Sequence, residues 1–280
     1  MQGLAKAVSQ LRLFFPPECS ISFLKAEALP LLQTVEMAAG AMLFAGIVGL
    51  LAALYVGARL PGSRLLYGCL ASFRAIPDLT LAILCVMLVG IGPAAGLVAL
   101  SAFYSAAIGK IFADLFVSAD PEPVDALRAT GAGPVIVAVA GLLPLRLKDL
   151  LTYGAYEFES AMRAAVIVGA VAAGGIGTEL ISAINETDYR HVTTLVIMLA
   201  LLVAFFDRIA WLVRRYPSLL LIFVVGGSIS AWINRPQMFA WSFFSSRLHK
   251  MWPPAIPAQD LHHVPVLIAE TLMIALGEPS

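Results

Sequence analysis

The chain has 280 residues, of which 60% are hydrophobic and 13% are charged, and its formal net charge is zero. Soluble domains carry about 25% charged residues, so a water-soluble fold of this composition would leave large apolar patches exposed. The zero net charge excludes the basic field typical of nucleic-acid binding and the acidic tail typical of a disordered arm.

The first apolar segments are long enough for membrane helices. Leu31 to Val56 contains one charge, Glu36, whose carboxylate we expect to reach the outer membrane interface. Residues 76–109 contain one charge, Asp78. As one helix they would be about 51 Å long, whereas a single crossing needs about 30 Å. The stretch 90–93, GIGP, therefore predicts a tight hairpin between two helices.

Further apolar segments follow in the second half of the chain. A helix is expected to begin near Pro144 and to run past Phe158, and two more are expected at 192–213 and 217–234. A last apolar stretch occupies 264–276. Together these segments predict an all-α, polytopic transmembrane helical bundle.

Positive charge in short loops indicates the orientation of such a bundle. Residues 59–74 carry three arginines and no acid, whereas 179–190 carry three acids and one arginine. Placing the arginine-rich connection in the cytoplasm puts 110–148 on the cytoplasmic side and the N-terminus outside.

Two parts of the chain are similar at a constant offset of 237 residues. The matched positions are Pro16-Pro17 with Pro253-Pro254, Leu24 with Leu261, Thr34 with Thr271, Ala38 with Ala275 and Gly40 with Gly277. One interpretation is coincidence among apolar helix starts. The other is that a second repeat begins near Met251 and is cut off at Ser280, since parallel repeats are a known way to build transporters.

The stretch 118–144 predicts a short helix, a turn and a second helix. Asp120 is a suitable N-cap, and Pro121 suits the first helical position, where no amide hydrogen is needed. Gly131 is placed to end this helix. A second apolar helix is expected to open at Gly133-Pro134 and to end at Pro144.

This stretch resembles the cytoplasmic loop of ABC importer permeases. That loop contains Glu-Ala-Ala, three residues, Gly, nine residues, and Ile-x-Leu-Pro. Here the spacing is matched, with Asp125 replacing the Glu, Leu127 replacing the second Ala and Gly141 replacing the Ile. The resemblance implies that the loop docks into a cytoplasmic ATPase subunit through Asp125, Ala126, Arg128, Gly131, Leu143 and Pro144. The alternative is an ordinary capped surface helix.

Further motifs are similar to the phosphonate type of these permeases. They are FRAIPD at 73–78, DPEPVDALRATGA at 120–132, FESAMRAA at 158–165, GGIG at 174–177 and DY at 188–189. One departure is Ala161, where asparagine is usual. The resemblance implies a type I importer permease core of five helices with one or two extra C-terminal helices. It also implies import of phosphonate or a related phosphorus oxyanion.

The resemblance implies an organisation and a set of partners. The expected regions are an external N-terminal segment (1–29) and a permease domain (30–216). A linking transmembrane helix (217–234) would follow, and then an external loop with the start of a truncated second repeat (235–280). The partners would be an ATPase subunit that binds the ATP, an external substrate-binding protein and a second permease unit. The location would be the bacterial inner membrane.

Glu159 and Arg163 are four residues apart and can pair on one helix face. Each is costly inside a membrane, by about 2.5–3.5 kcal/mol on insertion scales, so they form either a structural ion pair or part of a pathway for an anion. Gly174, Gly175 and Gly177 form either a flexible gate or a close-packing turn. No Gly-Lys-Ser/Thr follows them, so no nucleotide loop is predicted.

Two other classes of function were weighed. An ion-coupled secondary transporter would use Glu159 and Arg163 as coupling residues but leaves the loop from Asp125 to Pro144 unexplained. An intramembrane enzyme would need a catalytic constellation at membrane depth, and no catalytic residue is predicted. The cysteines and histidines show no metal-ligand spacing, so neither a metal site nor a cofactor in this chain is expected.

Overall fold

The computed structural model describes residues 14–215 and 218–234, which form helices and connecting turns with no strand among them. The helices are α2 (Ile21–Gly57), α3 (Ser63–Arg74), α4 (Asp78–Val89), α5 (Pro93–Val117), α6 (Pro121–Ala129), α7 (Pro134–Ile136), η2 (Val137–Leu142), α8 (Leu143–Val168), η3 (Gly169–Ala173), α9 (Ile176–Asn185), α10 (Tyr189–Arg215) and α11 (Ser218–Asn234). The all-α prediction is confirmed for these residues. The predicted repeat within 235–280 lies outside them.

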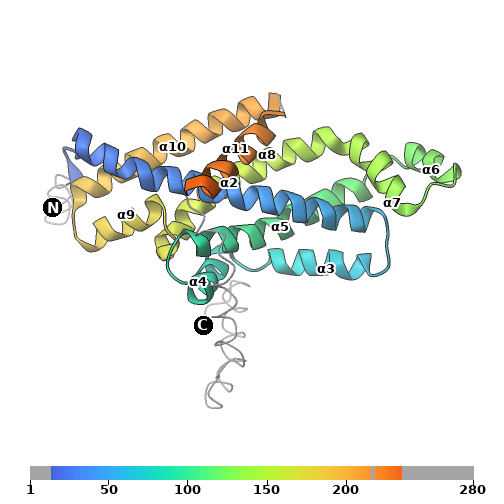
Figure 1. Ribbon diagram of the computed structural model, residues 1–280, viewed down its shortest axis with the longest axis horizontal. Helices are drawn as coiled ribbons and strands as arrows, with labels where there is room; N and C mark the ends of the chain where they lie inside the picture. The colour runs from blue at the N-terminus through green and yellow to red at the C-terminus, as the bar shows by residue number, and fades with distance from the viewer. Residues whose placement is uncertain (1–13, 216–217, 235–280) are drawn as a thin grey trace, which may run out of the picture. The chain divides into compact units, whose positions relative to one another are not determined.

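The long helices α2 and α5 pack side by side at the centre of this arrangement (Figure 1). The two helices approach closely at Gly49, where an added Cβ would lie 2.8 Å from Ile108 Cγ2 and 2.9 Å from the backbone nitrogen of Gly109. Small residues at such a crossing let two backbones approach, and helix association inside a membrane depends on this packing.

Gly49→Ala is expected to destabilise the purified protein by about 1–3 kcal/mol. The added methyl group would clash with the backbone nitrogen of Gly109, which cannot move aside as a flexible side chain can. Thermal unfolding in detergent measures the effect. Gly46→Ala is the matched control on the same helix, since nothing lies within 4 Å of its added Cβ. Equal melting temperatures for the two variants would contradict the close crossing.

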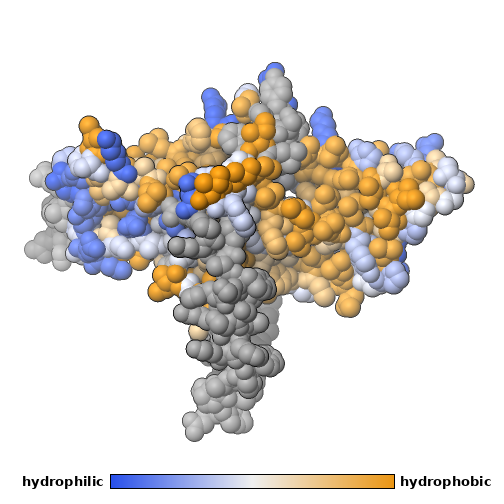
Figure 2. Space-filling model, viewed as in Figure 1, coloured by the Kyte–Doolittle hydropathy of each residue, from blue (hydrophilic) through white to orange (hydrophobic). Residues whose placement is uncertain are grey.

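Three helices are individually long and apolar enough to cross a membrane, among the residues that the structure describes: Ile21–Gly57, Pro93–Val117 and Tyr189–Ile209. The number rises to five if α3 with α4, and the helical stretch 134–171 with α9, each count as one bent span. Exposed apolar side chains include Phe44, Leu51, Leu201 and Phe205. Figure 2 shows hydrophobic side chains over much of the middle of the visible face, with hydrophilic ones toward its two ends.

The arginine-rich connection 59–74 is mostly helical, which the sequence did not predict. Helix α3 occupies Ser63–Arg74 and is bent by 91° from α4. The bend falls at Ile76, because a residue before proline disfavours helical backbone angles, and at Pro77, which has no amide hydrogen. Helix α4 is only about 18 Å long at 12 residues, too short to span alone. The predicted hairpin between Val89 and Pro93 is confirmed.

The predicted end of a helix at Pro144, with a new helix beginning there, is wrong. The backbone stays helical through this position, and Val137–Leu142 form a π-helical segment just before it. The amide of Leu143 donates to the carbonyl of Ala138, five residues earlier. Proline clashes with the carbonyl four residues before it in a regular α-helix, and a wider turn relieves that clash.

Glu36 does not reach the membrane interface as expected, since its side chain is 1% exposed. Its carboxylate accepts hydrogen bonds from Ser230 Oγ at 2.7 Å and from Asn234 Nδ2 at 3.1 Å. Ser228 Oγ also donates to the carbonyl of Ala39 at 3.1 Å. These polar contacts hold α11 against α2, where a lone carboxylate would be costly in lipid.

Candidate functional site

The stretch 118–133 forms the capped helix that the sequence predicts. Asp120 Oδ1 accepts a hydrogen bond from the amide of Glu122 at 3.1 Å, and Pro121 is the first helical residue. Arg128 pairs with Asp125 at 2.7 Å near the helix end. The positions of these charges suit the helix dipole, so α6 is stable as a short, separate element.

Gly131 forms the turn that ends α6. Its φ is +84°, and its amide donates to the carbonyl of Arg128 at 2.9 Å. This left-handed conformation favours glycine. Gly133 then has an ordinary φ of −65° and precedes the continuous helix that contains Leu143 and Pro144.

Helix α6 packs through one buried residue, Val124, while Asp125, Ala126 and Arg128 are exposed. It contacts η2, and the side chain of Leu127 lies close to Gly141. In Figure 1, α6 lies at the same end of α2 and α5 as the turn between α2 and α3. The predicted docking residues are thus brought together at the end of the membrane helices, with Leu143 and Pro144 following on the helix that α6 packs against.

Glu159 and Arg163 form the predicted ion pair, with 2.6 Å between Arg163 Nη1 and Glu159 Oε1. Asp207 of α10 is a second carboxylate beside Arg163, at 3.5 Å. The guanidinium therefore bridges α8 and α10. Sequence spacing could not reveal Asp207, because it lies 44 residues away on another helix.

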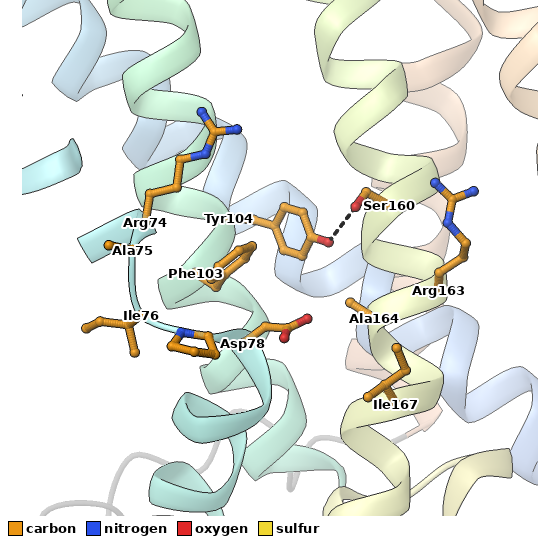
Figure 3. A pocket seen from close by; sticks show the side chains of 11 residues that line it. Arg74, Ala75, Ile76, Asp78, Phe103, Tyr104, Ser160, Arg163, Ala164 and Ile167 are labelled. Atoms are coloured by element: carbon orange, nitrogen blue, oxygen red, sulfur yellow. Dashed lines mark hydrogen bonds between the residues drawn. The ribbon is translucent and has the colours of Figure 1, made fainter. Parts of the chain in front are cut away.

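A pocket of about 460 Å³ lies beside this ion pair (Figure 3). Arg74, Asp78, Tyr104, Ser160 and Arg163 supply its polar lining. Tyr104 Oη donates to Ser160 Oγ at 3.2 Å across the pocket. The sequence motifs had included Arg74, Asp78 and Ser160 without assigning them a role, and Tyr104 was missed because no motif includes it.

The charges around this pocket are partly neutralised. Arg163 is shared with two carboxylates, whereas no hydrogen bond or ion pair engages the Arg74 side chain within the described part of the chain. Asp78 Oδ1 accepts from the amide of Leu79 at 2.8 Å. Arg74 therefore lines the pocket without a direct ion-pair partner among the described residues, while its charge acts at longer range on Glu157 and Asp114.

The glycine-rich segment lies outside that pocket and packs tightly. Gly174 and Gly175 have φ angles of +83° and +79°. An added Cβ at Gly175 would lie 2.4 Å from Thr34 Oγ1. That hydroxyl accepts a hydrogen bond from the amide of Ile176 at 3.0 Å, and this contact joins α2 to α9.

Gly177 lies against the helix that precedes it. An added Cβ would lie 2.2 Å from the carbonyl oxygen of Val166 and 2.7 Å from the amide nitrogen of Ala170. Thr178 Oγ1 donates to the carbonyl of Gly169 at 2.8 Å. Of the two interpretations left open by the sequence, this geometry favours the close-packing turn.

Residues 45–218 match the family model described as binding-protein-dependent transport system inner membrane component. The chain belongs to this family. The permease is a multi-pass membrane protein, and its family is one of transport permeases.

The permease is similar to curated proteins from bacteria. It is 29% identical over 191 residues to the phosphite transport system permease protein PtxC of Stutzerimonas stutzeri, covering 67% of this chain and 70% of that one. It is also 29% identical over 223 residues to the phosphate-import permease protein PhnE of Mycolicibacterium smegmatis, covering 73% of this chain and 42% of that one. It spans 56% of the length of another relative.

A solved structure shares the fold. A chain of the MetNI methionine ABC transporter in inward-facing conformations matches with a TM-score of 0.62 and 21% identity, covering 71% of the permease and 99% of that chain. The predicted type I importer permease fold is confirmed.

Proposed function

We propose that the permease is the transmembrane subunit of an ATP-driven importer for phosphonate or a related phosphorus oxyanion in the bacterial inner membrane. It would form the pathway with a second permease unit and receive its substrate from an external binding protein. ATP would bind to a cytoplasmic ATPase subunit, and α6 would dock on that subunit.

The observation that carries the coupling role is the geometry of α6. The helix is capped at its start, ended by a left-handed glycine, and buried through Val124 alone. A short, capped helix that presents Asp125, Ala126 and Arg128 to solvent can be displaced as a unit by a docked subunit. Its contact with η2 would transmit that displacement to the continuous helix that includes α8.

The substrate class is supported by two observations. The relatives are phosphite and phosphate transport permeases by name. The Arg74 guanidinium lines the pocket beside Tyr104 and has no ion-pair partner among the described residues. Guanidinium groups suit phosphorus oxyanions because their donors match the oxygen geometry.

The ion-coupled secondary transporter is the weaker alternative. Family membership supports an ATP-driven importer, and that class uses the α6 segment that a secondary transporter leaves without a role. The Glu159–Arg163 pair is also tied to Asp207, as expected of a structural bridge between helices.

Uptake by phosphate-starved cells tests the proposal. A strain lacking the gene, complemented with it, is expected to recover uptake of labelled methylphosphonate or phosphite only when its ATPase subunit can bind nucleotide. Uptake that persists with an inactive ATPase and stops on collapse of the ion gradient would establish the alternative. Unchanged uptake in the deletion strain for both compounds would remove the substrate class.

A further inference from the structure

A second polar pocket, of about 550 Å³, lies at the end of the membrane helices, away from the pocket that contains Arg74. It is formed where α2 ends, α3 begins and α5 ends. Its lining residues are Val56, Arg59, Ser63, Arg64, Tyr67 and Val117. This lining holds two arginines and no acid, so it is a candidate site for an anion.

The positive charge of this pocket is not neutralised within the described residues, where neither Arg59 nor Arg64 has an ion pair or a hydrogen bond from its side chain. The acid beside the pocket is already engaged. Asp114 binds Lys110 Nζ at 2.7 Å and accepts from Tyr67 Oη at 2.6 Å. Lys110 Nζ also donates to Tyr67 Oη at 2.7 Å. These three groups balance one another and leave both arginines free.

The backbone holds Arg59 in an unusual conformation, with a φ of +52°. Such angles are uncommon for residues other than glycine, and they persist where the surroundings enforce them, often at functional sites. Here the amide of Arg59 donates to the carbonyl of Val56 at 3.0 Å, and the Tyr55 hydroxyl donates to the carbonyl of Pro61. These hydrogen bonds fix the turn, and the turn positions Arg59 at the pocket.

The start of α3 adds to the positive field. The amide of Ser63 donates to the carbonyl of Leu60 at 3.0 Å, but no side chain caps the helix after Gly62, so the positive end of its dipole faces the pocket at Ser63 and Arg64. Helix α3 has 12 residues. The field of this helix end and the charge of the two arginines point to the same kind of ligand, an anionic phosphate group.

The level of the pocket along the helices identifies the source of that phosphate. Helices α2 and α5 end here at Gly57 and Val117, and we take this end of the bundle as the level of the lipid headgroups. Val117 of the pocket lining is 66% exposed, and Leu65, which follows Arg64 in the chain, is 74% exposed. Cationic groups next to exposed apolar side chains at the end of a span match a phospholipid, whose phosphate adjoins its acyl chains.

We infer that this pocket binds the phosphate of an anionic phospholipid through Arg59 and Arg64. The lipid is structural or regulatory and is distinct from the transported substrate. Arg59 also borders a pocket of about 350 Å³ that reaches Val124 and Arg128 of α6, so the lipid lies next to the segment that the ATPase is proposed to contact.

The test uses the full-length permease purified with its ATPase subunit, and spin-labelled phosphatidylglycerol or phosphatidylcholine as the probe. The variants are Arg59→Asn and Arg64→Gln. Asparagine tolerates the left-handed backbone, so the first variant removes charge without adding strain. Arg190→Gln is the control, because it neutralises an exposed arginine at the start of α10, toward the other end of α2 (Figure 1).

We expect the wild type to prefer phosphatidylglycerol over phosphatidylcholine and to lose that preference at high salt. Each pocket substitution is expected to weaken phosphatidylglycerol binding about fivefold, and both together about 25-fold. The control, phosphatidylcholine binding and the thermal unfolding midpoint should not change.

Several outcomes would overturn the inference. If the wild-type protein binds phosphatidylglycerol no better than phosphatidylcholine, the inference is wrong. This outcome does not depend on whether the variants fold. Unchanged binding in the folded double variant would also overturn the inference. Displacement of the lipid by millimolar inorganic phosphate would assign the pocket to a soluble anion, and loss of the ATPase subunit with intact lipid binding would assign it to a protein contact.

Discussion

Gly131→Val is expected to abolish ATP-driven uptake while the permease still inserts and folds. Gly131 has a φ of +84°, and nothing lies within 4 Å of its added Cβ, so valine would be limited by backbone conformation and not by a clash. The left-handed region costs about 1–2 kcal/mol for an ordinary residue, and a β-branched side chain is disfavoured further. The turn would reorganise and move α6 relative to η2. Uptake of labelled substrate, with membrane abundance measured in parallel, tests this.

Gly133→Val is the matched control in the same turn. Nothing lies within 4 Å of its added Cβ either, but its φ of −65° is ordinary for any residue. We expect this variant to retain uptake and to co-purify with the ATPase subunit, whereas Gly131→Val loses both. Normal uptake by the Gly131→Val variant would contradict the coupling role proposed for α6.

Gly177→Ala is expected to destabilise the permease by about 1–3 kcal/mol and to lower uptake through loss of folded protein. The added methyl would lie 2.2 Å from the carbonyl oxygen of Val166 and 2.7 Å from the amide nitrogen of Ala170. Both atoms belong to the backbone, which cannot give way as the end of a flexible side chain can. Thermal unfolding in detergent and uptake per folded molecule separate the two effects.

Gly226→Ala on α11 is the control for this substitution, because nothing lies within 4 Å of its added Cβ. Its thermal unfolding midpoint should lie within about 1–2 °C of the wild-type value. Substitutions at exposed positions usually change the free energy of unfolding by no more than about 0.5 kcal/mol. A Gly177→Ala protein with wild-type stability but no uptake would instead show that this segment moves during transport, in favour of the flexible gate.

The sequence by itself determined the features that depend on neighbouring residues. The all-α membrane class follows from composition, and the hairpin between Val89 and Pro93 follows from its glycines and proline. Helix α6 begins and ends as predicted because Asp120, Pro121 and Gly131 act on backbone groups within a few residues of themselves. The Glu159–Arg163 pair was predictable for the same reason, since four residues make one helical turn.

Only the tertiary structure decided the features that join distant segments. Ser230 meets Glu36 across 194 residues, Thr34 meets the amide of Ile176 across 142, and Asp207 meets Arg163 across 44. No local pattern encodes these partners, because each depends on which helix faces pack together. The 91° bend between α3 and α4 and the π-helical turn before Pro144 are backbone features that the sequence did not predict. In a bilayer nearly every helix face is apolar, so hydrophobicity identifies the helices but not their neighbours, and close glycine contacts and buried hydrogen bonds select the packing.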